Sequence, residues 1–215
     1  MVPKLLTEFV GTFFLVLTIG LTLVVGNREA PYAIAAVLIA MVYLGGHVSG
    51  AHYNPAVTLA FWLRGRLAGA EVAPYVLVQV VGAGLAALAA HAVTGEVLQV
   101  APAEETGTGA FFLIELLFTF ALVLVILNVA TTAGTAGNDY YGVAIGLVVL
   151  GGALVAGPIS GGAFNPAVAL GPALVDLALG DGSSVDTLWV YLGATVAGAA
   201  LAALAFRVQN PADHA

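Results

Sequence analysis

The stretch Ser49–Ala60, "SGAHYNPAVTLA", returns in the second half of the chain as "SGGAFNPAVALG" at Ser160–Gly171. In both copies an asparagine, Asn54 or Asn165, stands directly before a proline. Asparagine is favoured at the N-cap of a helix, and proline suits the first helical position because its missing N–H is not needed there. Each copy therefore predicts the start of a helix. The two predicted helices are Pro55–Leu63 and Pro166–Leu174.

Each predicted helix is too short to cross a membrane. At roughly 1.5 Å per residue it extends about 14 Å, which is half of a hydrocarbon core of about 30 Å. The composition nevertheless indicates a membrane protein, because the 215-residue chain is 61% hydrophobic and 8% charged, whereas soluble domains carry about 25% charged residues.

The residue types also limit the function. The chain contains no cysteine, which excludes disulfides and thiolate metal sites, and it has no basic cluster for nucleic acid. No grouping of side chains suggests catalysis, a metal site or a cofactor. We therefore expect a protein that is not an enzyme and whose main surroundings are membrane lipid.

Six stretches are apolar enough to span a membrane, which takes about 20 mainly apolar residues. The second and fifth are shorter, and each is followed by glycines that are expected to end the span. The six are Leu5–Val25, Pro31–Leu44, Val72–Val93, Phe111–Ala130, Tyr141–Ala156 and Leu188–Phe206. If they alternate in direction, four of the five basic residues fall on one side, and positive charge stays inside. Both termini are thus expected in the cytoplasm. The four are Lys4, Arg64, Arg66 and Arg207.

The two halves of the chain repeat each other. Glu8 in the first span matches Glu115 in the fourth, an offset of 107 residues, and the Asn-Pro-Ala segments match at an offset of 111 (165 minus 54). Each half has three spans, an odd number, so the second half enters the membrane from the opposite face. This predicts an inverted repeat within one channel domain, 1–215, with the repeats at 1–100 and 108–208.

An inverted repeat brings the two short helices together, N-terminus to N-terminus, near the middle of the membrane. Non-helical backbone is tolerated there only against protein or a water-filled cavity. The positive ends of both helices repel cations, and Asn54 and Asn165 offer amide donors at the same point. The arrangement predicts a pore for neutral molecules.

Several polar residues in or beside the spans have two possible roles. Charges within a membrane are costly and usually functional, but the matched positions of Glu8 and Glu115 favour bracing the re-entrant loops over relaying protons. We expect the same bracing role, rather than solute contact or pH gating, for His47, His52 and Gln79.

Other features point mainly to packing. Small residues cluster at 82–90 and 193–205 and predict close helix contacts. Three aromatic residues fit either pore lining or packing: Tyr43, Tyr53 and Phe164. Three more fit anchors at the membrane interface: Trp62, Trp189 and Tyr191.

Along nearly its whole length the chain resembles the aquaporin (major intrinsic protein) family. The matching stretches include "TEFVGTFFLV", "GHVSGAHYNPAVTLAFWLRGR", "VLVQVVGA", "AIGL", "GGAFNPAVALGPAL" and "LWVYLGA". The resemblance implies an all-α membrane fold of six transmembrane helices plus two re-entrant half-helices. It also implies a pore in every protomer, a homotetramer, and Asn-Pro-Ala residues at the centre of the pore. Those residues are Asn54, Pro55, Ala56, Asn165, Pro166 and Ala167. A third copy, beginning at Asn210, lies in the polar tail and is a coincidence.

The resemblance also places an outer selectivity filter. Water-selective members have a bulky aromatic, a histidine, a small residue and an arginine there, and the arginine directly follows the second Asn-Pro-Ala. The corresponding residues of this chain are all apolar: Ile34, Ala153, Gly162 and Val168. Without the arginine the filter loses a fixed charge and up to five donors, and we expect it to be wide. The next residue is Ala169, where glycerol-type members carry an aspartate.

Three functions follow from these observations. The first is a passive channel of the plasma membrane for water and small uncharged solutes. The second is a channel for larger neutral cargo, with water incidental: metalloid acids or organoarsenicals, urea, glycerol, ammonia or peroxide. Family members with valine in place of the arginine occur in bacteria beside arsenic-resistance genes. The third is a structural membrane protein with a vestigial pore.

Overall fold

The computed structural model describes residues 1–214, and its regular elements are helices throughout that part of the chain. Six helices are long and apolar enough to cross a membrane: α1 (Val2–Val24), α2 (Ala30–Ser49), α4 (Gly69–Thr94), α5 (Thr108–Thr131), α6 (Tyr141–Ser160) and α8 (Ser184–Gln209). Two shorter helices are α3 (Pro55–Leu63) and α7 (Pro166–Leu179), and two 3-10 turns are Ala133–Thr135 and Pro211–His214. The predicted all-helical architecture is confirmed.

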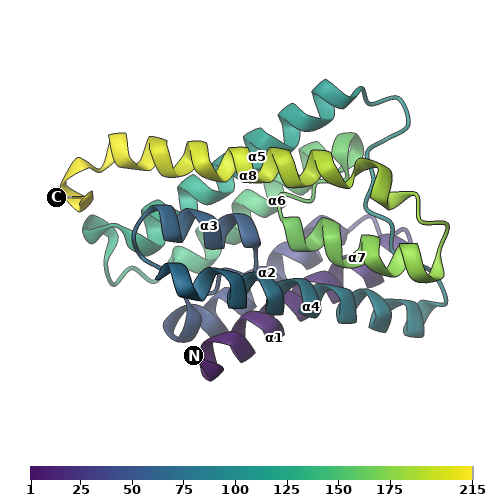
Figure 1. Cartoon of the computed structure of the whole chain (residues 1–215), viewed down its shortest axis with the longest axis horizontal. Helices are drawn as coiled ribbons and strands as arrows, with labels where there is room; N and C mark the ends of the chain where they lie inside the picture. Colours follow the sequence, from purple (N-terminus) through teal and green to yellow (C-terminus); the bar gives the residue numbers. More distant parts are fainter. Residues whose placement is uncertain (215) are drawn as a thin grey trace.

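The short helices lie in the middle of the bundle. Figure 1 shows α3 and α7 between the pair α1 and α4 and the pair α5 and α8, with α3 toward the end that holds both termini and α7 toward the other end. Helix α3 packs on α8, and α7 packs on α4. Each short helix thus packs on the last span of the other half, which ties the halves together.

Glycines allow the long helices to cross closely. A Cβ atom on Gly82 of α4 would lie 2.9 Å from the carbonyl oxygen of Phe9 in α1. A Cβ atom on Gly198 of α8 would lie 2.6 Å from the carbonyl oxygen of Leu116 in α5. Both distances are too short for a side chain, so the expected packing role of small residues is realised at matching places in the two halves.

Two predicted spans were too short. Helices α2 and α6 continue to Ser49 and Ser160 and do not end at Leu44 and Ala156, because the glycines that follow those points remain helical. The helices end at Gly50 and Gly161, which adopt left-handed φ angles of 90° and 80°. A left-handed glycine is a common end of a helix.

The second short helix is longer than predicted. Helix α7 has 14 residues and passes Pro172 to end at Leu179, whereas the prediction ended it at Leu174. Proline removes one backbone hydrogen bond, but α7 packs closely on α4 through Gly171, whose Cβ position lies 2.4 Å from that of Ala83. This packing favours continuation of the helix.

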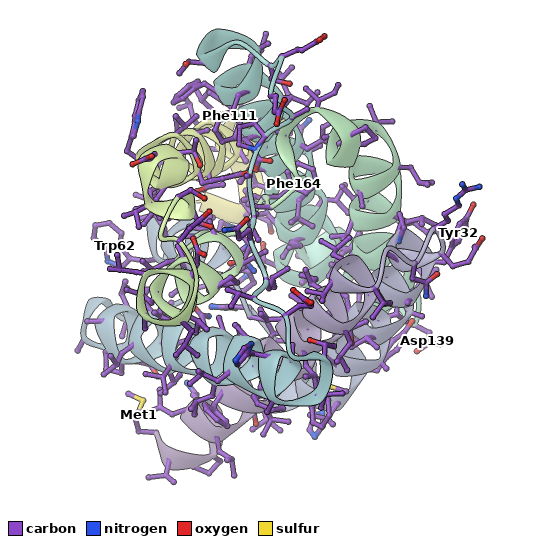
Figure 2. The ribbon with its side chains drawn as sticks, turned by 90° about the vertical axis from the view of Figure 1, so that its right-hand side faces the viewer. Met1, Tyr32, Trp62, Phe111, Asp139 and Phe164 are labelled. Atoms are coloured by element: carbon purple, nitrogen blue, oxygen red, sulfur yellow. The ribbon has the colours of Figure 1, made fainter. Side chains whose placement is uncertain are left out.

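Figure 2 looks along the bundle and places Phe164 near its middle, with Met1, Tyr32 and Trp62 at the periphery. Trp62 and Trp189 are 46% and 63% exposed, as expected of interface anchors. The assignment of Tyr191 as a third anchor was wrong, because its side chain is buried and its hydroxyl donates to the carbonyl of Ser160.

Candidate functional site

The two Asn-Pro-Ala segments meet inside the bundle. Asn54 caps α3 by accepting a hydrogen bond at Oδ1 from the N–H two residues on (2.8 Å), and its Nδ2 donates to the carbonyl of Phe164 (2.9 Å). Asn165 caps α7 in the same way (2.9 Å), and its Nδ2 donates to the carbonyl of Tyr53 (2.9 Å). Each asparagine thus holds the residue that precedes the other one.

These crossed bonds leave part of each amide available. An amide nitrogen carries two hydrogens, and the crossed bond uses one of them. Both asparagines line the central cavity described below. The N-termini of α3 and α7, which begin at Pro55–Ala56 and Pro166–Ala167, lie at the same place and contribute the positive ends of two helix dipoles.

A buried carboxylate holds the first re-entrant loop. Glu8 is fully buried in α1 and accepts four hydrogen bonds. Its Oε1 accepts from the Ser49 hydroxyl (2.6 Å) and the His52 N–H (2.9 Å), and its Oε2 accepts from the Tyr53 N–H (2.7 Å) and Gln79 Nε2 (2.8 Å). Two of the four donors are N–H groups of the re-entrant loop, so Glu8 contacts the backbone of that loop directly.

Glu115 holds the second loop in the same manner but with fewer partners. Its Oε1 accepts from the Ser160 hydroxyl (2.6 Å) and the Ala163 N–H (3.0 Å), and its Oε2 accepts from the Phe164 N–H (2.8 Å). Charge-assisted bonds of this kind contribute about 1.5–3 kcal/mol each. They compensate for the cost of placing a carboxylate inside the bundle.

The first loop also has a polar network that the second half lacks. Gln79 Nε2 donates to the Thr58 hydroxyl at 3.0 Å, and His52 Nδ1 lies 3.1 Å from the same oxygen. The residues 111 positions after His52 and Thr58 are Ala163 and Ala169. The two loops are therefore alike in backbone path and different in side-chain support.

His47 does not brace the loop, which corrects the prediction. Its side chain is exposed at the end of α2, and it forms no hydrogen bond with any described residue. Because α2 continues to Ser49, His47 lies in the last turn of this helix and not in the loop, and its side chain faces outward. His47 lines a hollow at the end of the bundle that holds the termini.

Sequence reasoning missed the role of two tyrosines, each of which bonds to the last residue of the helix that precedes a re-entrant loop. The hydroxyl of Tyr75 donates to the carbonyl of Ser49 (3.0 Å), the last residue of α2, and Tyr191 makes the same bond to Ser160, the last residue of α6. Both tyrosines are buried. A signal was present, because they stand 116 residues apart, the same offset as Gly82 and Gly198.

The loops contain strained backbone. Three non-glycine residues beside the asparagines have positive φ angles: Ala51 (51°), Tyr53 (50°) and Phe164 (47°). Such conformations are uncommon and cluster at functional sites. Here they turn the chain so that carbonyls of the loops face the two asparagine amides.

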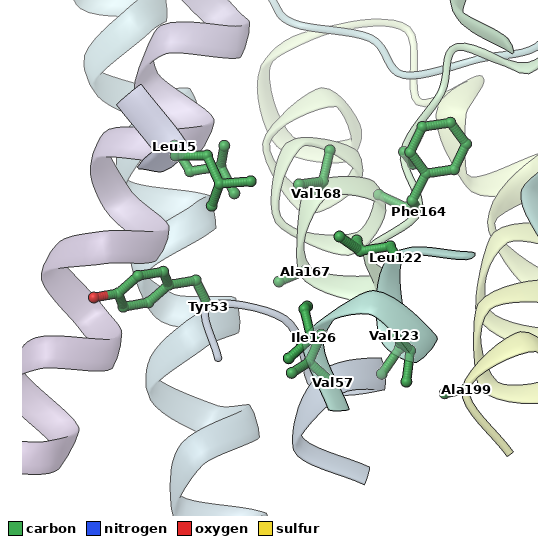
Figure 3. Close-up of a cluster of buried hydrophobic side chains, with 14 of the residues drawn as sticks. Leu15, Tyr53, Val57, Leu122, Val123, Ile126, Phe164, Ala167, Val168 and Ala199 are labelled. Atoms are coloured by element: carbon green, nitrogen blue, oxygen red, sulfur yellow. The ribbon is translucent and has the colours of Figure 1, made fainter. Parts of the chain in front are cut away.

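The three undecided aromatic residues all make packing contacts, and two of them, Tyr53 and Phe164, also line the central cavity described below. The Tyr53 ring fits against Gly11 and Gly45, and its hydroxyl donates to the carbonyl of Met41 (2.8 Å). Phe164 lies against Phe118, with ring centroids 5.4 Å apart. Figure 3 shows the Tyr53 and Phe164 side chains pointing away from each other. Tyr43 donates to the carbonyl of Asp139 (2.8 Å) and stacks edge-on with Tyr141.

A central cavity brings together residues from both halves. About 110 Å³ of it is accessible to the centre of a water molecule. All four residues at the expected filter positions line it: Ile34, Ala153, Gly162 and Val168. So do His52, Asn54 and Asn165. Since a water molecule needs about 10–15 Å³ by this measure, several can occupy the cavity at once.

Sequence reasoning missed part of the cavity wall. Leu15 and Ile19 of α1 and Leu122 and Ile126 of α5 line it, as does Val100 of the loop between α4 and α5. The signal was again the repeat, because each α1 residue stands 107 positions before its α5 counterpart. Among residues 1–214 no group of three or more His, Asp or Glu side chains could hold a metal ion.

Comparison with known proteins agrees with this geometry. The family model of the major intrinsic proteins matches residues 1–206. The chain is 35% identical to glycerol uptake facilitator protein-like 6 of Lactiplantibacillus plantarum, over 98% of this chain and 99% of that protein. It is 40% identical to aquaporin NIP1-4 of Oryza sativa subsp. japonica, over 94% and 75% of the two chains. It is also similar in fold to the aquaglyceroporin of Plasmodium falciparum, with a TM-score of 0.88 at 22% identity, covering 99% of this chain and 98% of that one.

Proposed function

Because the chain belongs to the major intrinsic protein family, we propose that it is a passive channel for water and small uncharged solutes, with a wide apolar outer filter. The observation that carries this proposal is the central cavity, in which the crossed asparagines stand beside four apolar residues at the filter positions. The protein is a multi-pass membrane protein, and the family consists of channels rather than enzymes.

The asparagine pair supplies the part of the pore that discriminates by charge. Two helix N-termini, each equivalent to about half a positive charge, face the same point and repel cations. The free amide hydrogens of Asn54 and Asn165 donate to an oxygen of the passing solute. A water molecule that accepts both bonds cannot relay a proton through this point.

The outer filter discriminates less strongly between neutral solutes than a filter that contains an arginine. An arginine would present a fixed charge and up to five donors, and Val168 presents neither. Selectivity in such pores depends on diameter, on lining donors and on electrostatic barriers. With Gly162 and Ala153 beside Val168, the filter admits neutral molecules larger than water and holds none of them by a side-chain hydrogen bond.

A second function is favoured by the same apolar lining. A filter whose four residues offer no side-chain donor does not favour water over other neutral cargo: a metalloid acid or organoarsenical, urea, glycerol, ammonia or peroxide. Water is incidental in that case. The name of the Lactiplantibacillus plantarum relative refers to glycerol uptake, which is consistent with this class of cargo.

The assembly and orientation form part of the proposal. The chain is a single channel domain in the plasma membrane, with both termini in the cytoplasm, and four copies form a homotetramer in which each protomer has its own pore. Both termini lie at one end of the bundle (Figure 1), and the predominance of basic residues on that side supports the orientation.

Stopped-flow light scattering on proteoliposomes tests these functions. Vesicles are exposed to gradients of an impermeant sugar, of glycerol and of urea. Fast shrinkage with slow re-entry of solutes supports a water channel, and fast re-entry of glycerol or urea supports the second function. Rates equal to those of protein-free vesicles for every solute would leave only a structural role with a vestigial pore.

A further inference from the structure

The central cavity meets a second, wider hollow at the end of the bundle that holds the termini. This inner hollow is lined by the last residues of α2 and α5, by the first residues of α6 and by the segment 132–138. Three residues line both spaces: Val42, Ile126 and Ile145. Their apolar side chains therefore stand between the central cavity and the inner hollow.

The inverted repeat relates this junction to the outer filter. Residues 111 positions apart are counterparts in the α2–α3 and α6–α7 segments. The four filter positions have these counterparts: Ile34 and Ile145, Ala153 and Val42, Gly162 and Ala51, Val168 and Val57. All eight residues line the central cavity. The cavity thus has matching rings of side chains on the two sides of the asparagine pair.

Figure 3 shows the two members of one counterpart pair. Val168 and Val57 directly follow the two Asn-Pro-Ala segments, and they lie at different heights in the view, with Ile126 close to Val57. Val57 is buried, and its neighbours in the ring, Val42 and Ile145, are buried too.

The two rings differ in size in a consistent direction. Two pairs are identical, Ile with Ile and Val with Val. In the other two pairs the inner residue is larger, because Val42 corresponds to Ala153 and Ala51 corresponds to Gly162. The inner ring is therefore the more crowded one.

We propose that Val42, Ala51, Val57 and Ile145 form an inner selectivity filter, and that this filter rather than the outer one sets the size limit for cargo. The proposal rests on the channel function proposed above. A solute must pass two rings without side-chain donors or acceptors, one on each side of the asparagine pair. Each ring removes part of its hydration shell, and crossing is therefore easiest for small uncharged molecules that carry apolar surface.

The test changes the size of one ring at a time. Val42→Ala gives the inner ring the alanine that the outer ring already has, and Ala153→Val makes the opposite change in the outer ring. We expect Val42→Ala to raise glycerol flux at least about tenfold, since the change removes two methyl groups and a single methylene in an apolar pocket already changes discrimination by about tenfold or more. Val143→Ala serves as a control, because Val143 is 42% exposed and lies outside the cavity.

A second measurement does not depend on enlarging the ring. The chain has no cysteine, so a single Val42→Cys variant carries one thiol. A small thiol reagent should block its flux, and an impermeant reagent should reach it only from the side of the termini. The mirror variant Ala153→Cys should be reached only from the opposite side.

The outcomes separate the two proposals. Wild-type vesicles that conduct no faster than protein-free ones would overturn the channel function and the inner filter together. Conducting wild-type protein would overturn the inner filter alone if Val42→Ala, shown to be folded by gel filtration, left glycerol flux unchanged. The same conclusion would follow if the adduct at position 42 did not reduce flux.

Discussion

Replacing either crossed asparagine with aspartate should make the channel leak cations. Asn165→Asp keeps almost the same shape. One carboxylate oxygen still accepts the N-cap bond of α7, as Oδ1 of the asparagine does at 2.9 Å. The other oxygen takes the place of the amide nitrogen that donates to the Tyr53 carbonyl at 2.9 Å. Two acceptors then face each other, and the crossed bond is lost. Asn54→Asp does the same to the Phe164 carbonyl.

The cost in stability should be moderate. Loss of a buried hydrogen bond that leaves its partner unsatisfied lowers the free energy of unfolding by about 1–3 kcal/mol. A negative charge at a helix N-terminus raises it by about 0.3–1 kcal/mol. The net cost of about 1–2 kcal/mol is small beside a typical stability of about 5–15 kcal/mol. Both variants should therefore fold.

The effect on ions should be much larger. A carboxylate about 4 Å from a passing cation attracts it by about 4 kcal/mol at an effective dielectric constant near 20. At 1.36 kcal/mol per factor of ten, this corresponds to about a thousandfold higher cation occupancy at the centre of the pore. Water flux should change little, because the remaining lining is the same.

Proteoliposomes loaded with a pH-sensitive dye, and parallel measurements of sodium uptake, test this expectation. Asn210→Asp is the matched control, since Asn210 begins the third Asn-Pro-Ala and bonds to Asn128 and Phe206 at the C-terminal end of α8. If both pore variants conduct water normally and exclude protons and sodium as well as the control does, the asparagine pair is not the charge barrier.

Three further results are expected. Val168→Arg should lower glycerol and urea flux while water flux persists, and equal solute fluxes in stopped-flow traces would contradict the placement of the outer filter. Gly198→Ala should be less stable than Gly193→Ala by about 1–3 kcal/mol in denaturant titrations, the usual cost of overpacking. The added Cβ meets a backbone carbonyl at 2.6 Å in the first case and only a ring atom at 3.5 Å in the second. Tyr75→Phe and Tyr191→Phe should each cost about 1–3 kcal/mol in the same titrations, because each leaves a helix-ending carbonyl without its donor.

The parts of this structure that depend on local rules could be predicted from the sequence. An asparagine before a proline begins α3 and α7, and counting spans gives the relative direction of the two halves. The meeting of Asn54 with Asn165 follows from those two steps alone. No contact had to be known in advance, because a twofold axis relates the two copies of an inverted repeat, and equivalent residues near that axis lie close to each other.

The ends of helices and the directions of side chains could not be predicted in this way. The glycines after Leu44 suggested that the second span ends there. Helix α2 nevertheless continues to Ser49, because packing against α1 and α6 outweighs the low helix propensity of glycine. His47 lies in that extension with an exposed side chain, and other residues brace the loop in its place. The direction of Tyr191 is likewise decided by the end of α6, which lies far from it in sequence.

The unequal support of the two loops follows the unequal size of the two rings. Glu8 and Glu115 hold the two loops alike, each through one serine hydroxyl and two loop N–H groups. The first loop has in addition the contacts of Gln79 with Glu8 and Thr58 and of His52 with Thr58. The first loop and its flanking helices also supply the larger ring residues. In a crowded ring a small loop displacement changes the width of the passage by a larger fraction than in the outer ring, where glycine and alanine leave more room. The half of the pore with the larger ring residues is also the half that carries the additional polar network.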